Sequence, residues 1–112
     1  MGTVVLGTGS CLPEKVLTNK ELQSFVDTSD EWIRSRTGIE SRCMAGQGEQ
    51  TYQLSAEAAR RALAAAGVAP EEIGLLVVGT ISSHMLMPST ARFVQKEIGA
   101  TNAFAYDLNA AC

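Results

Sequence analysis

Residues 74–79 read GLLVVG, and this stretch decides the fold. Its four central residues are all apolar, so they lack the polar and apolar alternation of a strand with one face in water. An unbroken apolar run is typical of a strand covered on both faces, as in the parallel sheets of α/β proteins. The run extends from Ile73 to Ile81 with few polar interruptions. We therefore expect a central strand here, with helices packed on its sheet.

Helical patterns flank this strand. In residues 51–66 apolar side chains return at about the helical period, alanine is frequent, and Gly67 is the expected terminator. After the strand, Pro88 suits the first turn of another helix, which we expect to continue to Gly99. Residues 104–108, FAYDL, are predicted to form a further strand. Strands that alternate with helices indicate a parallel or mixed layered sheet.

The N-terminal part of the chain is predicted to contribute a strand and two short helices. The apolar run within residues 2–8 indicates a buried strand. Thr18 or Asn19 can cap a helix. The apolar face of that helix would be formed by Leu22, Phe25 and Val26. Residues 28–31, TSDE, fit a capping box, and the helix that follows is expected to end near Gly38.

The predicted order is strand, helix, helix, helix, strand, helix, strand, with a loop at residues 43–49. We find no internal repeat and no clear linker, so we expect one α/β domain. Three strong strands are few for a doubly covered sheet, which usually has about 4–6. The last strand also leads into small residues, as though into another helix. We therefore expect the chain to be the first part of a larger fold.

Composition excludes several classes of protein. The chain has 112 residues, 46% of them hydrophobic and 19% charged, which is typical of a soluble globular protein rather than a disordered tail. A net charge of −3 argues against nucleic-acid binding through a general basic field. No apolar run approaches the ~18 residues of a membrane span, and the N-terminus lacks the pattern of a signal peptide. We therefore expect neither a nucleic-acid nor a membrane partner.

The three cysteines, Cys11, Cys43 and Cys112, have no spacing typical of a metal site. Their odd number, without a secretory signal, favours free thiols in a reducing compartment, and hence a cytoplasmic protein. The only histidine, His84, lies where a strand is expected to end, so it is either a packing residue or a site residue, and packing is favoured. Residues 7–10, GTGS, follow a strand pattern but lack the third glycine of a dinucleotide fingerprint, and we interpret them as a tight turn.

Two further positions allow both a structural and a functional interpretation. Trp32 is either a core anchor or an aromatic surface that stacks on an adenine, with Arg36 one helical turn away to meet a phosphate. Cys112 is either a small buried side chain or a nucleophile at the start of a helix, where the helix dipole favours the thiolate. A thiolate there could accept an acyl group.

Taken together, these segments resemble β-ketoacyl-acyl carrier protein synthase III, the initiating condensing enzyme of dissociated fatty-acid synthesis. The resemblance rests on residues 7–13 (GTGSCLP), 27–39 (DTSDEWIRSRTGI), 74–78 (GLLVV), 88–91 (PSTA) and 107–112 (DLNAAC). It implies a thiolase-like α/β fold of layered αβαβα halves. Residues 1–112 would supply most of the first half, up to the nucleophile. The family is an acyltransferase that joins acetyl-CoA or another acyl-CoA to malonyl-acyl carrier protein, with release of CoA and CO2.

The resemblance also implies roles for individual residues. Cys112 would be the nucleophile that carries the acyl group as a thioester. Thr28, Trp32 and Arg36 would bind CoA, through the adenine and the phosphates. Met87 stands where the family often has a phenylalanine that lines the acyl pocket of the partner in a homodimer, and methionine is more flexible. No metal or resident cofactor is implied, since CoA enters as the substrate carrier.

The family's catalytic histidine and asparagine lie far downstream of the cysteine and are not in this chain, so residues 1–112 alone are expected to be inactive. Two alternatives remain open at this point. One is a related thiolase-fold enzyme of polyketide or alkylquinolone synthesis, because these motifs do not separate the two. The other is a non-catalytic α/β fragment or binding module in which Cys112 is structural.

Overall fold

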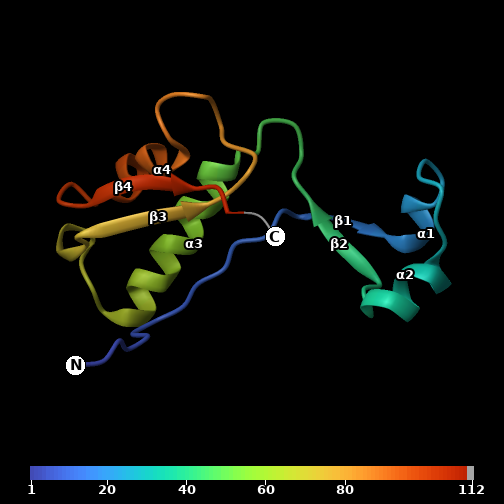
Figure 1. Cartoon of the computed structure of the whole chain (residues 1–112), viewed down its shortest axis with the longest axis horizontal. Helices are drawn as coiled ribbons and strands as arrows, with labels where there is room; N and C mark the ends of the chain where they lie inside the picture. The colour runs from blue at the N-terminus through green and yellow to red at the C-terminus, as the bar shows by residue number, and fades with distance from the viewer. Residues whose placement is uncertain (111–112) are drawn as a thin grey trace. The chain divides into compact units, whose positions relative to one another are not determined.

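The computed structural model describes residues 1–110 (Figure 1). The chain divides into two compact units. The larger unit combines Met1–Cys11 with the chain from Gln50 onward. The smaller unit, Leu12–Glu49, is inserted between those two parts in the sequence, and its end follows the glycine-containing segment at residues 46–48.

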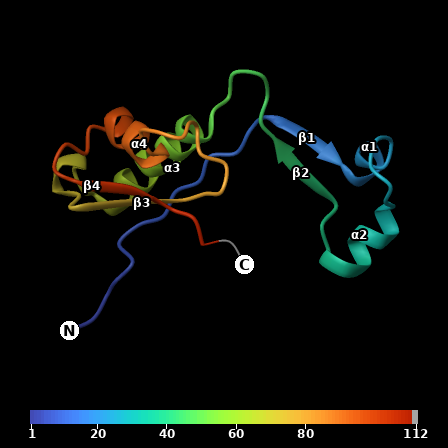
Figure 2. The same ribbon diagram turned by 45° about the horizontal axis from the view of Figure 1, so that its top comes forward.

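A parallel pair of strands is the centre of the larger unit. β3 (Leu75–Gly79) pairs with β4 (Phe104–Leu108) over all five residues of each strand. α3 (Thr51–Ala66) and α4 (Thr90–Ile98) pack against each other and lie on one side of this pair (Figure 2). A short 3-10 turn, η1 (Pro70–Glu72), precedes β3. The helices and strands predicted from Thr51 onward are therefore confirmed, and α3 has the predicted bounds. Pro88 precedes the N-cap Ser89, so it does not lie in the first turn of α4, where the sequence predicts it.

The core of this unit lies between the two helices and one face of the strands. Its buried members are Ala56, Val94, Ile98, Ala100 and Ala103, with Leu76 and Val78 of β3 packed against them. On the opposite face of β3, Leu75 and Val77 are exposed. The apolar run led us to expect cover on both faces of β3. Among the described residues only one face is covered, because α3 and α4 lie on the same side.

Glycines and one buried amide determine how the helices of the larger unit end. Gly67 and Gly99 follow α3 and α4 with φ values of 65° and 77°, a left-handed conformation that glycine adopts without a Cβ clash. The buried side-chain amide of Gln95 donates hydrogen bonds to the carbonyl oxygens of Ala100 (2.8 Å) and Ala103 (2.7 Å). This amide fixes the turn that leads from α4 into β4.

The strand predicted at residues 2–8 is wrong. The segment has no ladder partner among the described residues and lies instead against α3. Gly7 and Gly9 come so close to α3 that a Cβ on Gly9 would lie 2.4 Å from the carbonyl oxygen of Ala58. The guanidinium of Arg61 donates a 2.7 Å hydrogen bond to the carbonyl oxygen of Ser10. The side chains of Val4, Val5 and Leu6 are exposed, so the apolar run is not explained by burial among the described residues. The segment approaches α3 through Gly7 and Gly9, which are spacers rather than a phosphate-binding turn.

The smaller unit consists of a two-stranded ribbon and two short helices. β1 (Lys15–Thr18) pairs antiparallel with β2 (Ser41–Met44), while α1 (Asn19–Leu22) and α2 (Asp30–Thr37) lie between them in the sequence. Neither strand was predicted, because each has only four residues and no apolar alternation. The loop predicted at residues 43–49 consequently starts too early.

Both short helices begin within one residue of the predicted caps. Thr18 caps α1 through a capping box, but α1 is a single turn, and Phe25 and Val26 lie beyond it and are exposed rather than forming its apolar face. The capping box predicted at residues 28–31, with Thr28 as the cap, is not formed: Ser29 caps α2 one residue later and accepts from the N–H of Trp32, and Gly38 ends the helix with a φ of 71°. None of the helices among residues 1–110 is both long enough and apolar enough to cross a membrane.

The close approach of Gly9 to α3 predicts that Gly9→Ala destabilises the larger unit. The new Cβ would lie 2.4 Å from the backbone nitrogen of Ala62 as well, so the segment of Gly9 or the helix must move. Overpacking of this kind costs about 1–3 kcal/mol. Urea unfolding should show a lower free energy of unfolding for Gly9→Ala and no change for Gly2→Ala, where no atom lies within 4 Å of the added Cβ. Equal midpoints for the two variants would contradict the packing described here.

Candidate functional site

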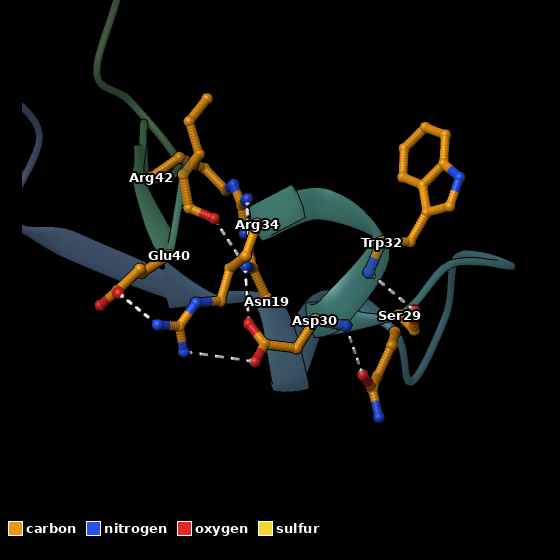
Figure 3. A network of polar contacts seen from close by, with 9 residues as sticks. Asn19, Ser29, Asp30, Trp32, Arg34, Glu40 and Arg42 are labelled. Atoms are coloured by element: carbon orange, nitrogen blue, oxygen red, sulfur yellow. Dashed lines mark hydrogen bonds and ion pairs between the residues drawn. The ribbon is translucent and has the colours of Figure 1, made fainter. Parts of the chain in front are cut away.

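Trp32 presents an aromatic surface to solvent on the first turn of α2. The residue is 56% exposed, and in Figure 3 its ring points away from the polar network at the base of the helix. Its backbone N–H donates to the hydroxyl of Ser29 at 3.1 Å, which fixes the start of the helix. The guanidinium carbon of Arg36 lies 5.4 Å from the ring centroid, within the range of a cation–π contact. An exposed aromatic ring and a cation therefore share one face of α2.

An open pocket of about 340 Å³ adjoins this ring. It is lined by Asp27, Thr28, Ser29 and Trp32. The pocket thus combines a flat aromatic surface with the hydroxyl and carboxylate groups of the segment before α2. Of the sequence-predicted residues, Thr28 and Trp32 line this pocket, and Arg36 contacts the Trp32 ring without belonging to the lining. Such a site can hold a planar base and offer a cation to a phosphate.

A buried asparagine holds α2 against the ribbon of the smaller unit (Figure 3). Asn19 is 1% exposed. Its amide nitrogen donates to a carboxylate oxygen of Asp30 (2.8 Å) and to the carbonyl oxygen of Ile39 (2.7 Å), while its amide oxygen accepts from Arg42 (2.6 Å). Arg34 adds an ion pair with Glu40, at 3.0 Å between its nitrogen and the carboxylate oxygen. The network connects the first turn of α2 to β2, and so determines where Trp32 is presented.

The capping box of α1 perturbs one carboxyl group in the same unit. The backbone N–H and the hydroxyl of Thr18 both donate to one carboxylate oxygen of Glu21, each at 2.8 Å. Hydrogen bonds to the charged form lower the pKa of the Glu21 carboxyl below its ordinary value. Glu21 therefore stays ionised and keeps the box closed to a lower pH than an isolated glutamate would.

The larger unit contributes a second candidate region, at the carboxyl ends of its parallel strands. An open pocket of about 500 Å³ there is lined by Gly79, Thr80, Ile81, Ser82, Leu108 and Ala110. The backbone N–H of Thr80 donates to the carbonyl oxygen of Leu108 at 3.2 Å, so the ends of β3 and β4 are held together. Sites of α/β proteins form at this edge of the sheet. Cys112, the predicted nucleophile, lies outside the described residues.

The loop between β3 and α4 carries the last two predicted candidates. Met87 is 81% exposed, and its side chain has no place in the core of its own unit. His84 is half-buried between the rings of Tyr52 and Phe93, and its Nδ1 lies 3.1 Å from the side-chain oxygen of Gln50. The packing interpretation of His84 is thus supported. Sequence reasoning missed its partners, because Gln50 and Tyr52 lie more than thirty positions upstream and no spacing links them.

Known proteins identify the fold and the kind of protein to which this site corresponds. No known family model matches the chain. A crystal structure of 3-oxoacyl-[acyl-carrier-protein] synthase III from Aquifex aeolicus matches with a TM-score of 0.91 and 44% identity, over 99% of this chain and 36% of that one. The priming β-ketosynthase of the R1128 polyketide pathway matches with a TM-score of 0.89 and 44% identity, over 96% and 32%. The fold is therefore that of the thiolase-superfamily condensing enzymes.

Relatives found by sequence indicate to which of the condensing enzymes this chain is similar. The β-ketoacyl-[acyl-carrier-protein] synthase III of Desulfotalea psychrophila is 61% identical over 112 residues, which is all of this chain and 35% of that protein. The chain is thus homologous, over its full length, to the N-terminal third of the β-ketoacyl-[acyl-carrier-protein] synthase III proteins. It spans about a third of the length of the curated relatives that it matches. The resemblance inferred from the sequence motifs is confirmed.

The buried position of Asn19 predicts that Asn19→Ala destabilises the smaller unit. Truncation removes three part-buried hydrogen bonds, those to Asp30, Arg42 and the carbonyl oxygen of Ile39, and a hydrogen bond to a charged group is worth about 1.5–3 kcal/mol. Urea unfolding should show a loss of at least that size. The matched control is Asn102→Ala, which removes an exposed hydrogen bond to the carbonyl oxygen of Glu71 and should cost about 0.5 kcal/mol or less. A loss for Asn19→Ala no larger than the control would show that the network is dispensable.

Proposed function

We propose that the whole protein carrying this chain is a condensing acyltransferase that initiates fatty-acid synthesis. It would join the acyl group of acetyl-CoA or another acyl-CoA to malonyl-acyl carrier protein and release CoA and CO2. The observation that carries this proposal is the exposed Trp32 ring with the Arg36 guanidinium beside it, in a chain 61% identical to a named synthase III. Its substrates are acyl-CoA and malonyl-acyl carrier protein, and CoA acts as a substrate carrier rather than a resident cofactor.

The chemistry assigns one covalent role to this chain. The Cys112 thiolate would attack the carbonyl carbon of the acyl-CoA thioester, and the CoA sulfur would leave and take up a proton. Malonyl thioester would then lose CO2, and the electron pair of the broken C–C bond would attack the acyl carbon held on Cys112. The new C–C bond forms as the cysteine sulfur leaves as thiolate, so the enzyme returns to its starting state. The strand β4, which ends at Leu108, would carry the nucleophile to the carboxyl edge of the sheet.

The pocket beside α2 is proposed to hold the CoA moiety. Trp32 is exposed enough for an adenine to stack on it, and base–aromatic stacking is worth about 1–3 kcal/mol. Thr28 lines the same pocket and can hydrogen-bond to the base. Arg36 carries the cation for the CoA phosphates, and a guanidinium suits phosphate geometry. These three residues would bind the donor without taking part in bond making.

Met87 is proposed to contact a second copy of the protein. The loop residue is exposed in its own unit, and the family places a residue at this position in the acyl pocket of a homodimer partner. A cytoplasmic location is proposed because Cys11 and Cys43 are both free thiols, which suits a reducing compartment.

A second candidate function is priming of a polyketide. The match to the R1128 priming β-ketosynthase, with 44% identity and a TM-score of 0.89, favours it. The two functions differ in the carrier protein that supplies malonate and in the starter acyl group. Assays of the whole protein with malonyl-carrier proteins of both pathways separate them.

Cys112 is predicted to be the reactive thiol of the whole protein. A thiolate at a helix start has a pKa of roughly 3.5–7.5, against about 8.5 for a free cysteine, and therefore reacts faster at neutral pH. Mass spectrometry after brief iodoacetamide treatment should find Cys112 labelled before Cys11 and Cys43. Prior incubation with acetyl-CoA should protect it by forming the thioester. Faster labelling of Cys11 or Cys43 would overturn the assignment.

Trp32→Ala is predicted to weaken acyl-CoA binding. Loss of about 1–3 kcal/mol of stacking corresponds to a roughly 5- to 150-fold increase in the Kd for acyl-CoA. Transfer from acyl-carrier-protein donors, which present no adenine, should change much less. Phe25→Ala is the matched control, because it removes an exposed aromatic ring from the same unit outside the pocket. An unchanged Kd for Trp32→Ala would return Trp32 to a packing role.

A further inference from the structure

The loop between β3 and α4 presents three apolar side chains to solvent at its tip. Residues 80–89, drawn in orange tones between β3 and α4 in Figure 1, form no helix or strand. Met85, Leu86 and Met87 are all exposed, and Leu86 is 99% exposed. Apolar residues do not hold such a tip in place by burial in their own unit. A loop that presents Met87 to an acyl pocket therefore needs an anchor elsewhere.

His84 provides that anchor. Between Ser83 and Pro88, the residues that the structure describes make hydrogen bonds only through His84. Its backbone N–H donates to the hydroxyl of Thr90 at 3.2 Å, and its Nδ1 contacts the side-chain oxygen of Gln50 at 3.1 Å. The oxygen of an amide is an acceptor, so Nδ1 carries the proton and donates. Both anchor points lie on helices or directly before one.

Aromatic packing adds a third constraint on the same residue. The ring centroid of His84 lies 4.9 Å from that of Tyr52 on α3 and 4.8 Å from that of Phe93 on α4, in both cases edge to face. Tyr52 and Phe93 also contact each other, with centroids 5.2 Å apart. Edge-to-face arrangements of this kind are the favourable ones. The three rings attach the loop to both helices of the unit.

Thr90 joins this anchor to the strand that leads to Cys112. Its hydroxyl accepts from His84, and its own backbone N–H donates to the Asp107 carboxylate on β4 at 2.7 Å. The backbone N–H of Ala91 donates to the other oxygen of that carboxylate, also at 2.7 Å. Thr90 and Ala91 are fully buried. The Met87 loop, through His84, and β4, through Asp107, are thus both hydrogen-bonded to the N-terminus of α4.

We propose that His84 is a positioning residue that holds the Met87 loop and thereby sets the acyl-chain preference of the condensing site. The inference rests on the proposed function, because Met87 is assigned to the acyl pocket there. His84 touches neither substrate nor nucleophile in this proposal and acts through the loop that it holds. Release of the anchor allows Met87 to move, so the pocket discriminates less well against longer acyl groups.

The test compares two variants that remove different parts of the anchor. His84→Phe keeps an aromatic ring beside Tyr52 and Phe93 but loses the donor to Gln50. His84→Asn keeps a donor near the position of Nδ1 but loses the ring. The control is Ile98→Val, which trims a buried side chain of α4 far along the helix from the loop. All variants are made in the whole protein.

Two readouts are measured on each variant: hydrogen exchange of residues 80–89 by mass spectrometry, and the ratio of kcat/KM for acetyl-CoA to that for hexanoyl-CoA. We expect both His84 variants to exchange faster in residues 80–89 than wild type, with α3 unchanged, and to lower the ratio by about tenfold, a size typical of discrimination by pocket shape. Ile98→Val should leave the ratio unchanged. A ratio unchanged in both His84 variants, or lowered equally by Ile98→Val, would overturn the inference while wild-type activity upholds the proposed function. A wild-type protein without condensing activity would instead overturn the proposed function and the specificity role with it, and the exchange data would then decide the anchoring alone.

Discussion

The side chain of Asn19 makes three hydrogen bonds in a unit that has very little apolar core. Leu17 and Ile33 are its only buried hydrophobic residues among those described, and its length is near the limit of about 40 residues below which a domain needs other support. The amide satisfies a carboxylate, a carbonyl and a guanidinium at once, which no apolar side chain could do. Because α2 is held through this network, the aromatic surface of Trp32 depends on a residue that is thirteen positions upstream and contacts no ligand in our proposal.

The larger unit is held together in part by small residues on α3 and by a charged side chain that caps α4. Alanines on α3 let the segment before Cys11 approach the helix backbone, and the Asp107 carboxylate accepts both N–H groups at the start of α4. A carboxylate at a helix N-terminus is favoured by the helix dipole as well as by the hydrogen bonds. The two devices leave the carboxyl ends of β3 and β4 as a defined edge. In our proposal this edge would carry the nucleophile, which must be held in place for reaction with two successive substrates.

Local sequence signals predicted the helices better than the strands. The ends of α3 and α4 follow from glycine and from helical periodicity, which act within one or two turns. Residues 2–8 have the composition of a strand, yet the contacts shown for this region join Gly7 and Gly9 to α3, about fifty positions away, and composition carries no information on such contacts. At the candidate site, Thr28, Trp32 and Arg36 could be named from family motifs, and the ring contact between the last two follows from their spacing on one helix. The partners of His84 could not be predicted, because they meet only after α3 and α4 pack.

The docking of the first eleven residues on α3 has a consequence for synthesis of the chain. The segment leaves the ribosome before α3, and its binding surface on α3 is completed only when Ala66 has been made. In the interval the ribosome produces Leu12–Glu49, the residues of the smaller compact unit. The apolar run at Val4–Leu6 is exposed during that interval and stays exposed after docking, because it is Gly7 and Gly9 that approach α3. Because one unit is inserted into the other, the two parts of the larger unit are made at different times. The first part can pack only after the second has been made.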